Sequence, residues 1–163
     1  MNNKIVSLAL AITLLIGGAI FFLPSDEKNI RDNLESLAEY CSTVKSEPVL
    51  ETLQKVTLAA KLCTDPCKVH IEASQIDREF GQKDLTDRLL MMKKRLSNTT
   101  FIFEDTVVDV PGEDRATVLT TLRLSGEAVD GRFTDAYEMS ITVEKQDGDW
   151  LFSSFTVVEF MKK

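Results

Sequence analysis

The sequence has few of the residues that build metal centres and phosphate sites. It holds one histidine, His70, and three cysteines, Cys41, Cys63 and Cys67, and its seven glycines are scattered along the chain. Cys63, Cys67 and His70 follow a C-x3-C-x2-H spacing, which is not a usual zinc motif. There is no glycine-rich loop of the kind that cradles phosphates. We therefore expect no metal site and no cofactor, and no cysteine–histidine catalytic pair, because nothing orients His70.

The chain also lacks an excess of positive charge. Its 19 Lys and Arg residues stand against 26 Asp and Glu residues, which gives a net charge of −7. An acidic domain repels phosphate backbones, so we expect no nucleic-acid partner. The densest basic cluster, at 93–95, is interpreted as the last turn of a helix, where positive charge complements the helix dipole.

A run without charged residues lies near the start of the chain. Residues 5–23 contain no charged side chain and follow Lys4. Nineteen residues in a helix span about 30 Å, the thickness of the apolar core of a bilayer. The run predicts an uncleaved membrane anchor, with a cleaved signal peptide as the alternative. Lys4 then favours a cytoplasmic N-terminus and a domain outside the cytoplasm, on the periplasmic side in a bacterium. We divide the chain into this anchor or signal at 1–26 and one domain at 27–163.

The three cysteines have two interpretations that depend on the compartment. In an oxidising compartment Cys63 and Cys67, which are close in sequence, form a local disulfide and Cys41 remains a buried thiol. In a reducing compartment all three are small apolar residues.

Apolar residues recur at helical spacing in three segments of the domain. The spacing predicts helices over 27–44, 46–62 and 84–96, each with one apolar stripe. The stripe of the first helix includes Cys41, and that of the second includes Val49, Leu50 and Leu53. A short strand is predicted at 68–72, followed by a polar connection.

The last third of the chain alternates between apolar and polar residues. Strands are predicted at 100–110, 115–125, 132–145 and 149–161, and short Gly- or Asp-containing turns join them. Strands joined so closely are antiparallel. One face of this sheet is apolar, and we expect the three helices to cover it. The final strand is apolar on both faces, so it is central, or bulged, or in contact with a partner.

This order of elements resembles the nuclear-transport-factor-2-like superfamily, whose members share a cone-shaped α+β fold. The Gly148-Asp149-Trp150-Leu151 segment is similar to that superfamily's frequent opening of the last strand. The resemblance covers about residues 27–163 and implies three helices on a curved antiparallel sheet that encloses a pocket. In this superfamily the pocket ranges from catalytic to empty, so the fold by itself assigns no function.

Two acids share the parity of apolar residues in the predicted strands. Asp135 has the same parity as Phe133 and Tyr137, and Asp105 has the same parity as Phe103. A buried carboxylate with a raised pKa suits proton transfer, but strand ends and bulges also bring such residues to water.

We therefore predict a non-catalytic, membrane-tethered domain that binds a small apolar ligand or a protein partner. One alternative is an isomerase- or cyclase-like enzyme that uses Asp135 or Asp105 as the base and Tyr137 as a hydrogen-bond donor. The other is an assembly module that dimerises, or binds a protein partner, through the exposed face of the sheet.

Overall fold

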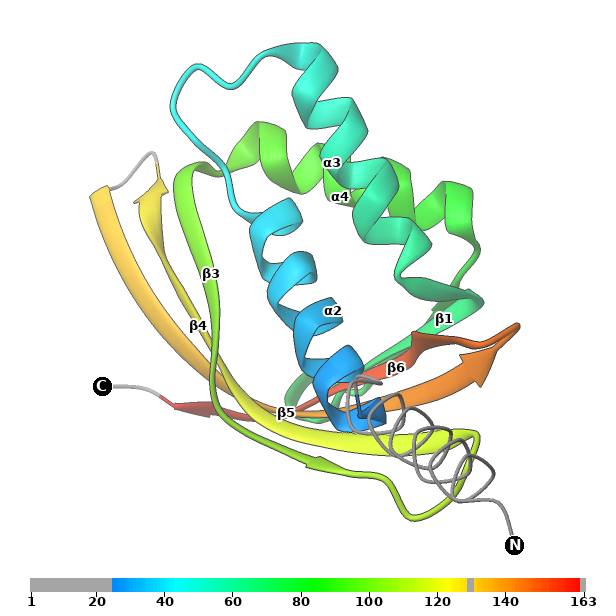
Figure 1. The fold of residues 1–163 in the computed structure, drawn as a ribbon. Coiled ribbons are helices and arrows are strands. Elements are labelled where there is room, and N and C mark those ends of the chain that lie inside the picture. Colours follow the sequence, from blue (N-terminus) through cyan, green and yellow to red (C-terminus); the bar gives the residue numbers. More distant parts are fainter. Residues whose placement is uncertain (1–24, 129–130, 162–163) are drawn as a thin grey trace, which may run out of the picture.

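The computed structural model describes residues 25–128 and 131–161, which form three α-helices on one face of a curved six-stranded sheet (Figure 1). This confirms the predicted α+β architecture. The predicted anchor, residues 5–23, lies outside the described residues, and within them no helix is long and apolar enough to cross a membrane. The elements are α2 (Asp26–Cys41), α3 (Val49–Lys61), β1 (Cys63–Ile71), a 3-10 turn η1 (Glu72–Ser74), β2 (Ile76–Phe80), α4 (Gln82–Arg95), β3 (Ser97–Asp109), β4 (Arg115–Ala128), β5 (Gly131–Gln146) and β6 (Asp149–Met161).

Helix α2 packs along the concave side of the sheet (Figure 1). Ser25 caps its first turn, because the Ser25 hydroxyl accepts a hydrogen bond from the backbone N–H of Lys28 at 3.2 Å. The predicted apolar stripe is buried as far as Cys41, where the helix ends. Val44 falls beyond that end and is exposed. The buried residues of α2 are Ile30, Leu34, Leu37, Ala38 and Cys41.

Trp150 ties the last strand to the first described helix. Its side chain is 2% exposed, and its indole N–H donates to the Asp26 carboxylate at 2.8 Å. Lys145 pairs with the same carboxylate at 3.1 Å and lies over the Trp150 ring at 5.2 Å from its centre. The side chain of Asn33 donates to the Trp150 carbonyl at 2.8 Å. The tryptophan of the segment that carried the resemblance therefore joins α2 to β6.

The strands follow the order β2-β1-β6-β5-β4-β3. Strands β3 to β6 form the predicted antiparallel meander, whereas β1 joins β6 in parallel. Strand β6 is thus central, which explains its two apolar faces, and its pairing with β5 is also bulged.

The sequence prediction missed β2 and shortened β1. Residues Ile76–Phe80 form a strand antiparallel to β1, although nearly all of them are exposed. Without a buried face, this strand has no alternation of apolar residues that a sequence pattern could reveal. β1 starts at Cys63 rather than at residue 68 because the bulged segment containing Asp65 and Pro66 still follows the sheet.

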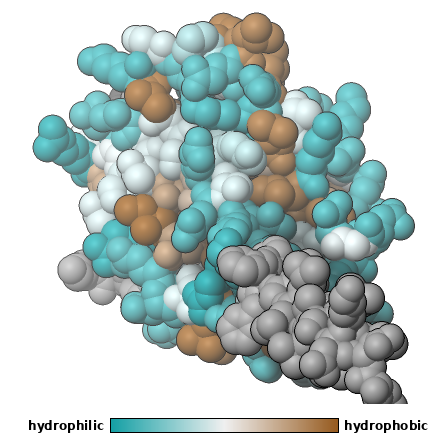
Figure 2. All heavy atoms as spheres, in the orientation of Figure 1, coloured by the Kyte–Doolittle hydropathy of each residue, from teal (hydrophilic) through white to brown (hydrophobic). Residues whose placement is uncertain are grey.

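The predicted apolar stripe of the second helix is wrong over the first turns of α3. Val49 and Leu50 are 76% and 79% exposed, and Leu53 is 42% exposed, so the buried stripe of α3 begins only at Val56. Figure 2 shows hydrophobic residues gathered at the top of the view, where α3 begins in Figure 1. The start of α3 extends past the helices and strands that cover its second half.

A buried lysine holds the segment between α2 and α3. The Lys93 side chain is 1% exposed, and its ammonium lies 3.2 Å from the Glu47 carboxylate. It also donates to the backbone carbonyls of Tyr40 and Ser42. Lys55 lies 2.7 Å from Glu47 on the other side. The basic cluster at 93–95 does form the last turn of α4, as predicted, but the Lys93 ammonium is buried there and anchors the neighbouring loop.

Candidate functional site

The cavity between the helices and the sheet is the first candidate site. It has a volume of about 180 Å³, and all three helices and five of the six strands contribute to its wall. The apolar stripes of the helices and the inward residues of the strands meet there without filling the space. The lining residues are Leu37, Ala38, Cys41, Ala59, Cys63, Leu85, Leu89, Met92, Phe101, Phe103, Leu122, Met139 and Phe155.

The chemistry of this cavity is that of an apolar binding site. No carboxylate, amide, hydroxyl or basic side chain belongs to its lining. An apolar cavity of about 150 Å³ in another protein stays free of water and binds benzene, so a cavity of this size and lining suits one small ring. Three phenylalanines and four sulfur-bearing side chains in the wall add polarisable surface.

The two acids singled out in the sequence lie away from the cavity. Asp105 is exposed and sits at a bulge with φ of 51°, where the pairing of β3 with β4 shifts register. The bulge breaks the alternation from which an inward orientation was inferred. Asp135 is also exposed, near the start of β5. Both therefore reach water, as strand ends and bulges allow.

The structure does bring Asp135 and Tyr137 together. Burial, the negative charge of Asp135 and a hydrogen bond with Asp135 raise the pKa of Tyr137. The Tyr137 side chain is half-buried and packs against the core, but neither residue belongs to the lining of the cavity. The pair expected for an isomerase-like enzyme is thus formed outside the lining of the apolar cavity.

The three cysteines are buried thiols, and two of them, Cys41 and Cys63, line the cavity. Burial raises the pKa of Cys41 to about 12, and contact with the Cys67 thiol raises that of Cys63. Cys41 therefore stays protonated at neutral pH. The Cys63–Cys67 disulfide remains a prediction for an oxidising compartment, which alkylation of non-reduced protein tests.

No metal site forms among the residues that the structure describes. His70 alternates with the core-facing residues of β1 and pairs in the sheet with Asp77 and Thr156. The cysteines face the core, so the C-x3-C-x2-H spacing does not converge on one point.

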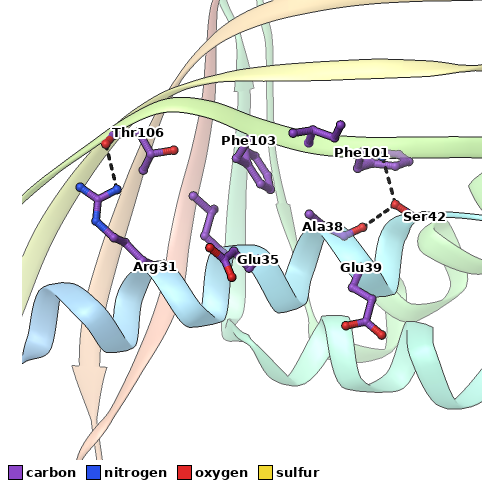
Figure 3. Close-up of a pocket in the computed structure, with 10 residues that line it drawn as sticks. Arg31, Glu35, Ala38, Glu39, Ser42, Phe101, Phe103 and Thr106 are labelled. Carbon is purple, nitrogen blue, oxygen red and sulfur yellow. Dashed lines mark hydrogen bonds between the residues drawn. The ribbon is translucent and has the colours of Figure 1, made fainter. Parts of the chain in front are cut away.

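An open groove lies beside the cavity, between α2 and the edge strand β3 (Figure 3). Its volume is about 490 Å³. It shares three wall residues, Ala38, Phe101 and Phe103, with the cavity, so these side chains separate the two spaces. Its other lining residues are Arg31, Leu34, Glu35, Glu39, Ser42, Ile102 and Thr106.

Sequence reasoning identified the faces of these elements, and the resemblance implied a pocket, but neither located these two spaces or their lining residues. Helical and strand periodicity marks residues such as Leu37 and Phe101 as inward, but it does not tell a filled interior from a hollow one. The groove depends on β3 being an edge strand, which follows from the strand order and not from any local pattern.

The sequence matches no known protein family and no curated protein. Solved structures, in contrast, share its fold. A protein from Kribbella flavida superposes with a TM-score of 0.67 at 18% identity, over 84% of this chain and 93% of that one. A hexachlorocyclohexane dehydrochlorinase from Novosphingobium barchaimii superposes with a TM-score of 0.63 at 14% identity, over 82% of this chain and 86% of that one.

A protein of unknown function with a cystatin-like fold, from Nostoc punctiforme, gives a TM-score of 0.64 at 11% identity, over 85% of this chain and 92% of that one. Identities this low show the fold alone, because one such fold carries both enzymes and proteins without known activity. The described residues have the cystatin-like, nuclear-transport-factor-2-like α+β fold that the sequence predicted.

Proposed function

We propose that this domain binds a small apolar molecule, about the size of one substituted ring, in the cavity between its helices and its sheet. The observation that carries the proposal is the wall itself, which lines about 180 Å³ with apolar side chains only. Contact with these side chains and removal of the ligand from water supply the binding free energy.

The lining of the cavity favours ligand binding over catalysis. Acid–base catalysis needs a proton donor or acceptor within hydrogen-bond reach of the substrate, and charge stabilisation needs aimed donors. The exposed carboxylates of Asp105 and Asp135 do not belong to the wall, and Cys41 is held protonated. The enzymatic alternative would have to operate at Asp135 and Tyr137, which do not line the apolar cavity.

The proposal also places the domain outside the cytoplasm, tethered by residues 5–23. Its support is the sequence alone, namely Lys4 followed by nineteen residues without charge. A reporter fused after Lys163 should be active only outside the cytoplasm. Activity confined to the cytoplasm would overturn this part of the proposal.

Binding is tested with n-butylbenzene and protein carrying 13C-labelled methionine methyl groups. Met92 and Met139 line the cavity, whereas Met91 is 47% exposed and serves as an internal control. We expect saturable shifts of the Met92 and Met139 signals while the Met91 signal stays in place.

A filled cavity provides the matched variant for this test. Leu89→Trp adds an indole to the wall and should weaken n-butylbenzene binding at least ten-fold, whereas Leu90→Trp, one residue along α4 and outside the lining, should not. Equal shifts at all three methionines, no shifts, or equal binding by both variants would contradict the proposal.

A second candidate function, assembly through the sheet, is favoured by two exposed residues. Val107 and Leu119 are 60% and 55% exposed and are direct partners in the pairing of β3 with β4. Leu119 alternates with Val118, which is fully buried, so this pair lies on the face that the helices leave uncovered. If this face dimerises, light scattering should show a dimer that Leu119→Lys converts to a monomer and the exposed-loop control Glu113→Lys does not. A monomeric parent protein would refute it.

A further inference from the structure

The groove beside the cavity contains an opening between α2 and β3, called the window below, and a hydrogen bond between the two elements closes each end of it. At one end the Arg31 guanidinium donates to the Thr106 carbonyl at 2.9 Å. At the other end the Ser42 hydroxyl accepts from the backbone N–H of Phe101 at 3.0 Å. Figure 3 shows these two contacts with Glu35 between them on α2. Phe101 and Thr106 are five positions apart along β3 with the bulge at Asp105 between them, so the window is shorter than the ~17 Å of a fully extended chain.

The edge of β3 presents open backbone groups inside this window. The N–H and C=O of Thr99 bond to Thr43, and the N–H of Phe101 bonds to Ser42, so these groups point away from β4 and toward α2. In an antiparallel pair this direction recurs at every second residue. Phe103 has the same parity as Phe101 in the pairing with β4, so the N–H and C=O of Phe103 point toward α2 as well.

The charge of the groove is negative. Glu35 and Glu39 line it from α2 and are exposed, and in the described part of the chain neither forms an ion pair. Arg31 is already paired with Glu27 at 2.9 Å and with the Thr106 carbonyl. Two carboxylates without an ion pair thus belong to the lining of this groove, and the one cation of the lining, Arg31, is already paired.

The groove and the cavity are adjacent compartments of opposite character. Ala38, Phe101 and Phe103 form part of both walls, so the two phenyl rings stand between the two spaces. Exposed aromatic side chains change rotamer within nanoseconds, and partly buried rings more slowly. A molecule with one apolar end and one polar end would span this wall.

We propose that the ligand is an amphipathic amine, with its apolar ring in the cavity and its ammonium in the groove near Glu35 and Glu39. This rests on the function proposed above, because the cavity must first accept the ring. The ammonium also meets the Phe103 carbonyl, which faces the same space. Phe101 and Phe103 form the portal, and the two glutamates select the charge.

A docked peptide strand fits the window less well. Strand addition needs several consecutive outward residues with free backbone groups. The contacts of Ser42 with Phe101 and of Arg31 with Thr106 occupy the edge of β3 on both sides of Phe103. Too few free backbone groups remain between them to pair with a peptide strand. A short, compact head group fits between these two contacts, whereas a peptide strand would have to break both hydrogen bonds.

Three probes with the same tail test the proposal: n-butylbenzene, 4-phenylbutylamine and 4-phenylbutanoate. Binding is followed at the Met92 and Met139 methyl groups and at the backbone N–H of Phe103. We expect the amine to bind up to about five-fold more tightly than n-butylbenzene, as for exposed ion pairs, and the carboxylate to bind more weakly than either. The preference should shrink at 1 M salt.

Matched variants assign the preference to the groove. The double substitution Glu35→Gln and Glu39→Gln should abolish the preference for the amine and leave n-butylbenzene binding unchanged, whereas Glu113→Gln, in an exposed loop, should change neither. If n-butylbenzene binds but the amine gains nothing, or keeps its gain in the double variant, the charge selection is refuted and the cavity function stands. If n-butylbenzene itself fails to bind, the cavity function is refuted, and this inference with it.

Discussion

Replacing Lys93 with methionine tests how firmly the loop after α2 is held. Methionine retains most of the apolar volume of lysine but removes the ammonium that contacts Glu47 and two backbone carbonyls. Breaking one side of a buried ion pair costs about 3–5 kcal/mol, because the remaining charge is left without its partner. Glu47 keeps Lys55 at 2.7 Å, so we expect the lower end, a loss of about 3 kcal/mol in the free energy of unfolding.

The assay is equilibrium unfolding in urea, followed by the fluorescence of Trp150, the only tryptophan and a buried one. Lys94→Met is the control, since Lys94 is the exposed neighbour on the same turn and should change stability by about 0.5 kcal/mol or less. A loss below about 1 kcal/mol for Lys93→Met, or equal losses for both variants, would show that the ammonium does not anchor the loop.

Two further predictions concern pH and packing. Burial raises the pKa of Glu47, but hydrogen bonds from Lys55, Thr52 and Lys93 outweigh it and leave that pKa below its ordinary value. Stability from Glu47 should therefore be complete above pH 4.5 and decline as the pH falls further, and Glu47→Gln should flatten this part of an acid titration followed by circular dichroism. Gly126→Ala should cost about 1–3 kcal/mol in thermal or chemical unfolding, because its Cβ would lie 2.4 Å from the Thr99 hydroxyl and 2.9 Å from the Thr99 Cα. Gly112→Ala, with no atom within 4 Å of the new Cβ, should be neutral, and equal effects of the two substitutions would contradict the packing argument.

The parts of the fold that sequence predicted are those with a buried, periodic face. The stripe of α2 and the alternation in β4 and β5 each put residues such as Leu34 and Ile141 in the core at regular spacing. β2 has no such face and was missed. The outward start of α3 was misplaced because Val49 and Leu50 continue the apolar pattern past the point where anything covers them.

The candidate site was less predictable because it depends on register and on empty space. Asp105 shares the parity of Phe103 in the sequence, but the bulge at Asp105 breaks that relation. Cys41 was expected in the core, and it is there, but its place on the wall of a cavity depends on how far α2 stands from β3 and α4. Such distances arise from packing between elements and leave no trace in the pattern of any one of them.

The central place of β6 has a consequence for the order in which this protein can fold. Among the described strands β6 comes last in the sequence, yet it lies between β1 and β5. While the ribosome has yet to release residues 149–161, the β1–β2 hairpin and the β3–β5 meander have no strand to join them. Each then exposes an unpaired inner edge, which is a template for association with other chains. The sheet can close only after β6 itself has been synthesised, so the nascent chain exposes these two edges until then.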